Sequence, residues 1–332
     1  MLIGRNDILL LLMKRVAVLR GGPSEEYSVS MQTGGKVLEA LDKLDYAFKD
    51  IVVTRKGEWL EQGLILQPES ALQAVDVVFV ALHGAYGEDG QVQRILERKK
   101  IPFTGSRALS SAIAFNKELT KHTLRNQGIN MPRHRRLTRS DIDNLEEEIP
   151  HIFAEIGREL FIKPVASGSS FGAFYVPNQE TFSTVVNQLL SEYETILVEQ
   201  FIRGKEATVG ILNNFRGEDF YALPVIEIVP PNGEPLFSNQ DKYNGNTEEI
   251  VPGRFSYSEK ERLSSAAQIV HKVIGCDQYS RSDFIVSDGE VYFLEVNTLP
   301  GLTNESLFPK AAAAVGLDYN QLIQHLIEGA TV

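Results

Sequence analysis

Oxygen-bearing side chains gather in two neighbouring segments near the end of the chain. Asp283 lies in the run RSDFIV, and Glu295 and Asn297 lie two residues apart in FLEVNTLPG. The turn sequence SDGE between the runs predicts a hairpin that brings all three to one side of paired strands. Two carboxylates and a carboxamide favour a hard cation such as Mg²⁺, which shares its oxygen ligands with phosphates. Solvated strand residues are the alternative, but an unpaired Glu295 in the apolar VYFLEV would cost several kcal/mol.

A glycine-serine segment, KPVASGSSFG, spans residues 163 to 172 between two strand-like runs. We predict a hairpin whose tip can wrap its backbone N–H groups around phosphate oxygens. The segment differs from the Walker pattern, because Lys163 precedes the loop. Alone, it would be read as a flexible hairpin. Beside a magnesium site, it is interpreted as a nucleotide lid.

Two loops in the first third follow apolar runs, where a parallel sheet presents its ligand-binding loops. They read RGGPSEEYSVS and LHGAYGEDG. His83 could equally be a buried core histidine, and Glu26 could be only a carboxylate favoured by a helix N-terminus. RGGPSEE lacks the GxGxxG pattern, which counts against a Rossmann dehydrogenase. The strand LVEQFIRGKE, with Glu199 and Glu206, is by itself only weak evidence for a binding site.

Alternating apolar runs and helical patterns predict a parallel α/β arrangement first and an antiparallel sheet last. The expected strands of the first part are 15–22, 76–84 and 101–106, with helices in the segments that follow the first two. One helix is expected over 110–129, another over 144–156, and a hairpin over 160–176. Antiparallel strands follow between 195 and 297, with helices near 258–274 and 319–328. The longest stretch without an evident element is 230–253.

Composition narrows the class of protein. The chain has 332 residues, enough for two or three domains. Its 44 acidic against 33 basic residues give a net charge of -11, which disfavours nucleic-acid and membrane-surface partners. Cys276 is the single cysteine, so no intramolecular disulfide is expected, which fits the cytoplasm. The apolar run 8–13 is too short to span a membrane; we read residues 1–13 as an extension, with Met13 as an alternative start.

Eight motifs occur in one order between Lys14 and Gly329: GGPSEEYSVS, LHGAYGEDGQVQ, PFTGS with NK at 116–117, KPVASGSSFG, VEQFIRGKEATV, KY at 242–243, SRSDF and EVNTLPGLTNESLFP. Together they resemble the ATP-grasp enzymes and, within them, the D-alanine-D-alanine ligase family. The resemblance implies an α/β (α+β) fold of three domains: an N-terminal parallel α/β domain at 14–114, a lid-bearing domain at 115–198, and an antiparallel catalytic domain at 199–332.

The resemblance also implies a reaction. ATP phosphorylates the carboxylate of one D-alanine, and the amine of a second attacks the acyl phosphate to form D-alanyl-D-alanine for peptidoglycan. Two Mg²⁺ ions, replaceable by Mn²⁺, would assist. A cytoplasmic homodimer is what the family suggests.

Site residues carry over by position. For ATP, the matching residues are Lys117, Lys163, Ser169, Ser170, Glu199, Phe201, Ile202, Glu206, Lys242 and Asn297. For the metal ions they are Asp283, Glu295 and Asn297. Glu26 matches the acid that holds the first D-alanine's ammonium, linked to Ser169 and Tyr243, with His83 beside it. Arg281 and the Gly301 N–H match the oxyanion-stabilising pair, and Ser306 matches the group that receives the second carboxylate.

Alternatives remain at this point. D-lactate-using relatives carry histidine where this chain has Tyr243, which favours the dipeptide, but the second substrate could still be D-lactate or D-serine. The loop LFSNQDKY departs from the usual aromatic-acid-aromatic run before the lysine, so its packing could differ. A non-catalytic nucleotide-binding relative is disfavoured because Arg281, Asp283, Glu295 and Asn297 are all present.

Overall fold

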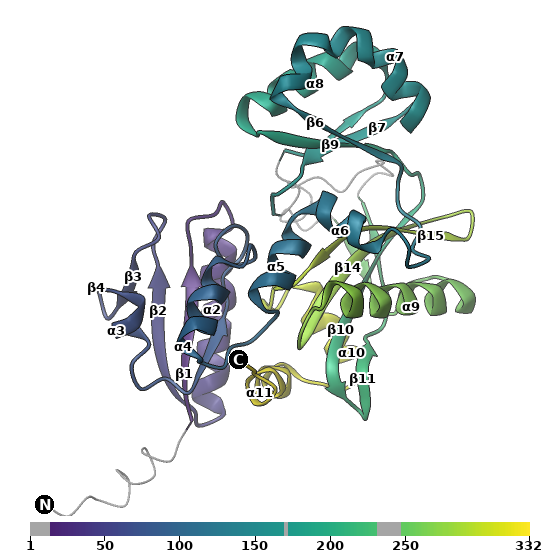
Figure 1. Cartoon of the computed structure of the whole chain (residues 1–332). Coiled ribbons are helices and arrows are strands. Elements are labelled where there is room, and N and C mark those ends of the chain that lie inside the picture. The colour runs from purple at the N-terminus through teal and green to yellow at the C-terminus, as the bar shows by residue number, and fades with distance from the viewer. Residues whose placement is uncertain (1–13, 169–171, 231–246) are drawn as a thin grey trace, which may run out of the picture.

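The computed structural model describes residues 14–168, 172–230 and 247–332, which form three β-sheets with helices packed on them (Figure 1). The mixed α/β class predicted from the sequence is confirmed. The predicted domain limits near residues 114 and 198 stay a prediction, and the predicted extension at 1–13 lies outside the described residues. Within the described part of the chain, none of the helices is both long and apolar enough for a membrane span.

The first sheet has the strand order β4-β3-β2-β1-β5. Its parallel part consists of β1 (Arg15–Gly21), β2 (Ala47–Val53) and β5 (Val77–Val80), and its antiparallel edge of β3 (Trp59–Glu61) and β4 (Leu64–Leu66). The helices here are α2 (Tyr27–Lys43), α3 (Pro68–Ala71) and α4 (Gln91–Lys99). The parallel prediction therefore holds for the centre of the sheet and is wrong for the edge made by β3 and β4.

The strand predicted at 101–106 is wrong. Only Phe103 forms bridges there, to Val78 and Thr331. Pro102 has no N–H to donate, and Gly105 has a φ of +92°, which turns the chain out of the extended conformation. The segment therefore makes isolated bridges at Phe103 and does not form a strand.

The second sheet is antiparallel, with the order β6-β9-β7-β8. Its strands are β6 (His134–Thr138), β7 (Leu160–Pro164), β8 (Phe174–Val176) and β9 (Thr195–Gln200). Helices α7 (Leu145–Ile156) and α8 (Gln179–Glu192) cover its outer face (Figure 1), and the 3₁₀ turn η1 (Arg139–Asn144) joins β6 to α7. The predicted hairpin over 160–176 is confirmed as β7 and β8.

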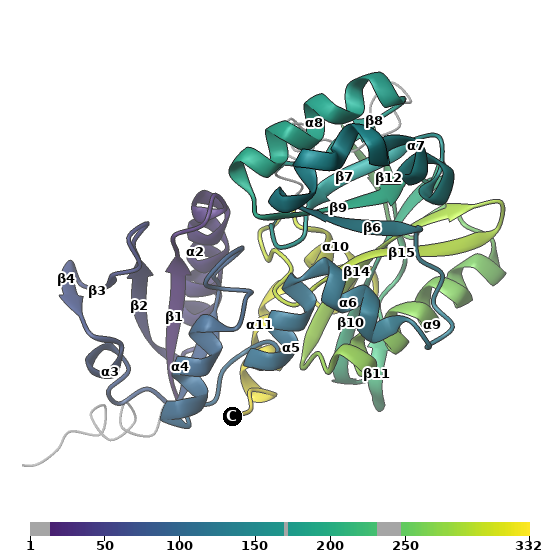
Figure 2. The ribbon, with the colours of Figure 1, turned by 45° about the horizontal axis from the view of Figure 1, so that its top comes forward.

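The third sheet has the order β13-β12-β10-β14-β15, with β11 paired to β10. Its strands are β10 (Lys205–Phe215), β11 (Glu218–Ala222), β12 (Ile226–Val229), β13 (Glu248–Ile250), β14 (Tyr279–Ser287) and β15 (Glu290–Asn297). Helix α9 (Tyr257–Ile274) packs on one face (Figure 2). The helices α10 (Leu307–Ala314) and α11 (Tyr319–Glu328) share a core with the first sheet. The antiparallel prediction is confirmed.

The single helix predicted over 110–129 is wrong, because the chain breaks at Asn116. Helix α5 (Ala108–Phe115) ends there and α6 (Lys117–Leu124) begins. Asn116 has extended backbone angles, φ −94° and ψ 101°, and its side chain accepts the N–H of Leu119 at 2.9 Å. An asparagine in this N-cap position stabilises the start of a new helix. The break makes Lys117 the first residue of α6.

Helix α9 buries a histidine that should make stability depend on pH. His271 Nδ1 lies 2.7 Å from the Ser280 hydroxyl, and burial lowers the pKa of His271 to about 4. The unfolded chain takes up this proton near pH 6.5, so the folded state loses about 1.4 kcal/mol per pH unit between pH 6.5 and 4 from this residue. Urea unfolding of His271→Gln between pH 7 and 4.5 should lack that slope.

The exposed His151 provides the control, since His151→Gln should keep the wild-type slope. Identical pH dependence in His271→Gln and the wild type would contradict a neutral buried His271.

Candidate active site

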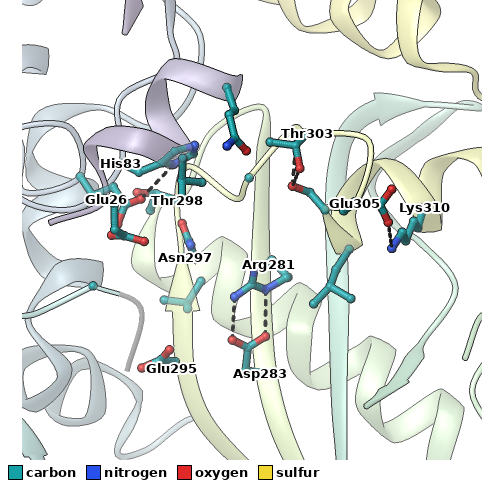
Figure 3. Close-up of a pocket in the computed structure, with 18 of the residues that line it drawn as sticks. Glu26, His83, Arg281, Asp283, Glu295, Asn297, Thr298, Thr303, Glu305 and Lys310 are labelled. Carbon is teal, nitrogen blue, oxygen red and sulfur yellow. Dashed lines mark hydrogen bonds and ion pairs between the residues drawn. The ribbon is translucent and has the colours of Figure 1, made fainter. Parts of the chain in front are cut away.

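A cleft of about 1170 Å³ runs between α2 and the loops of the first sheet on one side and the third sheet with the start of α10 on the other. Its lining includes most of the residues that the sequence singles out. These are Glu26, His83, Lys117, Glu206, Arg281, Asp283, Glu295, Asn297, Gly301 and Ser306. Figure 3 shows many of these side chains pointing into one space from different elements.

The hairpin β14-β15 places the predicted metal ligands on one face. Asp283 is the cross-strand partner of Glu295, and Arg281 is the partner of Asn297. Residues two apart on a strand face the same side, and cross-strand partners have Cβ atoms about 5 Å apart. The prediction that Asp283, Glu295 and Asn297 share one side of paired strands agrees with this register.

A β-bulge in β15 makes that arrangement work. Asp283 pairs with Glu295, but the next residue, Phe284, pairs with Phe293, so Leu294 is an extra residue. Phe293 packs in the core under α9. In a regular strand Glu295, two residues on, would point into the same core. The extra residue reverses the alternation, so that Glu295 and Asn297 face the cleft.

Arg281 and Asp283 form a two-pronged ion pair in the cleft. Arg281 Nε and Nη2 donate to the two carboxylate oxygens of Asp283, each at 2.9 Å. Thr208 of β10 donates its hydroxyl to Asp283 Oδ1 at 2.6 Å. Burial opposes the charge on Arg281, but Asp283, Glu295 and Glu88 outweigh it and raise the pKa of Arg281 further. The guanidinium is thus fixed in position and always charged.

Lys117 joins three parts of the chain. Its Nζ donates to the carbonyl oxygen of Ser167, just before the glycine-serine tip, at 2.8 Å, and lies 3.5 Å from Glu295 Oε2. Its own N–H donates to Val165 O at 2.9 Å. Because the chain breaks at Asn116, Lys117 lies at the start of a helix. From there it connects the second sheet with the hairpin β14-β15.

Glu199 forms a buried triad with two lysines. Lys163 Nζ lies 2.9 Å from Glu199 Oε2, and Lys121 Nζ lies 2.8 Å from Oε1. Burial alone would raise the pKa of the Glu199 carboxyl, but the two lysines lower it to about 2. Burial opposes the charge of Lys163, yet Glu199 and Glu295 raise its pKa, whereas burial lowers the pKa of Lys121. The Glu199 side chain is thus held by cations.

The segment after β9 carries three more of the residues predicted for ATP. Phe201 packs its ring 4.7 Å from that of Tyr175, and its N–H donates to Glu159 O at 3.0 Å. Ile202 follows, half-buried. Glu206 is the second residue of β10 and lines the cleft. The Phe201 N–H is thus already bonded within the protein.

His83 and Glu26 form the opposite wall. His83 is 4% exposed, with Nε2 2.9 Å from the Thr33 hydroxyl and Nδ1 3.6 Å from Glu88 Oε1. Burial opposes its protonation, but Glu88, Glu26 and the Leu299 backbone together raise the pKa of His83. His83 is therefore both a buried histidine and a neighbour of Glu26.

Two glycines allow the loops to approach Glu26. A Cβ atom on Gly168 would lie 2.2 Å from Glu26 Oε2, and one on Gly84 would lie 2.9 Å from it. A side chain at either position would force the Glu26 carboxylate to move. The glycine-serine segment from the second sheet therefore meets the first sheet at the Glu26 carboxylate, where the sequence predicts a link between Glu26 and Ser169.

Gly301 and Ser306 lie next to each other at the start of α10. Ser306 is its N-cap residue, and its Oγ accepts the N–H of Thr303 at 3.0 Å. A Cβ on Gly301 would lie 2.8 Å from that Oγ. A hydroxyl at a helix N-terminus suits an anionic group.

Four predicted residues lie outside the described part of the chain: Ser169, Ser170, Lys242 and Tyr243. The structure also adds residues that were not predicted. They are Lys121 on Glu199, Thr208 on Asp283 and Glu88 on His83. Lys121 had a sequence signal, because it follows Lys117 by four residues and so lies on the same side of one helix.

Comparisons with known proteins agree with this geometry. A family profile described as "D-ala D-ala ligase C-terminus" matches residues 123–328, and one described as "D-ala D-ala ligase N-terminus" matches residues 15–70 and 61–106. The chain is 36% identical to a D-alanine-D-alanine ligase of Desulforudis audaxviator over 318 residues, which is 95% of this chain and 98% of the relative. It is 37% identical to that of Pelotomaculum thermopropionicum over 319 residues, 95% of this chain and 96% of the relative.

Solved structures are similar over nearly the whole chain. VanG D-Ala:D-Ser ligase from Enterococcus faecalis superposes with a TM-score of 0.80 at 29% identity, covering 95% of this chain and 99% of that one. D-alanine-D-alanine ligase from Bacillus anthracis complexed with ATP gives a TM-score of 0.76 at 31% identity, with 96% of each chain covered. The resemblance inferred from the motifs is confirmed: this chain belongs to the D-alanine-D-alanine ligase family.

Proposed function

We propose that this protein joins two molecules of D-alanine at the expense of ATP. A carboxylate oxygen of the first D-alanine attacks the γ-phosphorus of ATP, and ADP leaves. The amine nitrogen of the second then attacks the acyl carbon, loses a proton, and phosphate leaves with the former P–O–C oxygen. The observation that carries the proposal is the shared face of Arg281, Asp283, Glu295 and Asn297, which opens onto a cleft that also contains Gly301 and Ser306.

The oxygen donors of Asp283, Glu295 and Asn297 fit a divalent cation. Two carboxylates and an amide oxygen from adjacent strands match the preference of Mg²⁺ or Mn²⁺ for oxygen ligands. Such an ion, when bound, would neutralise charge on the phosphates of ATP. Lys117 and Lys163 would add positive charge on the side of the second sheet, with Glu206 directed to the ribose.

The rest of the cleft would handle the amino acids. Glu26 pairs with the ammonium group of the first D-alanine, and Arg281 with the Gly301 N–H stabilises the oxyanion that forms when the amine attacks. Ser306 and the start of α10 receive the carboxylate of the second D-alanine. Positioning and charge stabilisation suffice for this chemistry, so no protein nucleophile is needed.

We infer further that the protein works in the cytoplasm as a homodimer on small-molecule substrates, in the supply of peptidoglycan precursors, without nucleic-acid or membrane partners. The net charge of -11 supports the exclusion of polyanionic partners. The homodimer rests on the family alone, and sedimentation of the purified protein tests it.

The choice of second substrate gives a direct test. We expect release of phosphate from ATP with D-alanine alone, and D-alanyl-D-alanine as the product by mass spectrometry. The similarity to a D-Ala:D-Ser ligase makes D-serine the second candidate, so D-alanine with D-serine and D-alanine with D-lactate are assayed in parallel. A mixed product formed in preference to the dipeptide would reassign the second substrate. No turnover with D-alanine in any combination would refute the ligase proposal.

A further inference from the structure

The triad of Lys121, Glu199 and Lys163 is almost completely buried. The side chains of Lys121, Glu199 and Lys163 are 0%, 2% and 7% exposed. Each carboxylate oxygen of Glu199 faces one lysine, Oε1 facing Lys121 and Oε2 facing Lys163. Glu199 lies in the middle of the second sheet, between His134 of β6 and Phe161 of β7. The lysines meet it from two different elements, α6 and β7.

The charges of the triad do not balance. Two ammonium groups against one carboxylate leave one net positive charge in a buried place, where such a charge is costly unless an anion approaches. Lys163 lies near the end of β7, just before the glycine-serine segment, and also interacts electrostatically with Glu295 and Asp283. Lys163 is therefore the member of the triad with which an anion in the cleft would interact.

Removing Lys121 would change what Lys163 can do. A buried carboxylate needs a partner, and with Lys121 gone Lys163 would be the only cation left on Glu199. The pair would then be neutral, and an incoming phosphate would have to compete with Glu199 for the same ammonium group. With Lys121 present, Glu199 keeps one cationic partner while Lys163 interacts with the phosphate of the ligand.

We propose that Lys121 is a positioning residue for nucleotide binding: by holding Glu199 from behind, it keeps Lys163 available to the phosphates of ATP. The inference rests on the proposed function, in which Lys163 contacts those phosphates. Helix α6 then contributes two lysines to the site. Lys117, at its first position, lines the cleft, and Lys121, one turn later, contacts Glu199 in the second sheet.

The test compares a ligand that has phosphates with one that lacks them. Lys121→Gln removes the charge while its amide can still donate to Glu199. We expect ADP to bind about tenfold more weakly to this variant, and the KM for ATP to rise with little change in kcat. Adenosine, which has no phosphate, should bind as it does to the wild type. Calorimetry measures ADP, and inhibition of ATP turnover measures adenosine.

Matched variants complete the experiment. Lys121→Arg keeps the charge and should retain ADP affinity; a neighbouring cavity of about 440 Å³, lined in part by Lys121, provides room for the larger group. Lys99→Met removes a lysine from a surface pair with Glu69 and should change nothing. Lys163→Met should weaken ADP but not adenosine. If Lys121→Gln does not fold, Lys121→Met is measured in its place.

Equal loss of ADP and adenosine affinity in the Lys121 variant would overturn the proposal, because it would indicate a role in packing alone. The proposal would also be overturned if Lys121→Gln kept its ADP affinity while Lys163→Met lost ADP affinity. If Lys163→Met binds ADP normally, the premise about the phosphates fails and the inference fails with it. A wild-type protein that binds no ADP would instead contradict the proposed function.

Discussion

Replacing Arg281 by methionine should lower kcat by about 10²- to 10³-fold, the usual effect of losing one donor to a developing oxyanion. The guanidinium is held by Asp283 through two bonds of 2.9 Å, so it is oriented before substrate arrives. Since the oxyanion forms only during the amine's attack, the KM for ATP should change much less than kcat. Steady-state phosphate release with varied ATP separates the two constants.

A second arginine pair provides the control for Arg281. Arg254 donates to the two oxygens of Glu227 at 2.9 and 3.1 Å, but it does not line the cleft. Arg254→Met should therefore leave kcat near the wild-type value. If Arg281→Met turns over within about threefold of the wild type, well short of the loss expected for an oxyanion donor, Arg281 is not one.

Sequence patterns predicted which segments lie around the cleft better than the exact path of the chain. The paired runs around SDGE were enough to place Asp283 and Glu295 on neighbouring strands, because a short turn leaves little freedom of pairing. The sequence pattern does not indicate the bulge at Leu294. Its apolar side chain fits a regular strand as well as an extra position, and pairing across strands decides between them.

The break at Asn116 was missed for a related reason. Apolar residues continue on both sides of it, so periodicity predicts one helix, and an asparagine inside a helical pattern is only weakly unfavourable. What decides is the N-cap bond from Leu119 and the contact of Lys117 with Ser167, fifty residues later in the chain. Strands β2, β3 and β4 were missed because only pairing in the sheet distinguishes their short runs from loop.

Replacing Glu199 by glutamine should destabilise the protein by about 3–5 kcal/mol, because the change leaves two lysines without a counter-charge in a buried place. Lys121 and Lys163 are both within 3 Å of its carboxylate. Urea unfolding at pH 7 measures the loss. Glu69→Gln is the control: its partner Lys99 lies 3.7 Å away on the surface, and such pairs contribute less than about 1 kcal/mol.

The same residue predicts a pH dependence whose sign can be worked out. The lysines hold the pKa of folded Glu199 at about 2, whereas the unfolded side chain titrates near 4.5. Its contribution is therefore complete above pH 4.5 and lost as the pH falls toward 2, by about 3 kcal/mol in all. The stability gap between wild type and Glu199→Gln should narrow over that range and stay constant from pH 5 to 8. A gap that is constant down to pH 3 would mean that Glu199 acts through shape rather than charge.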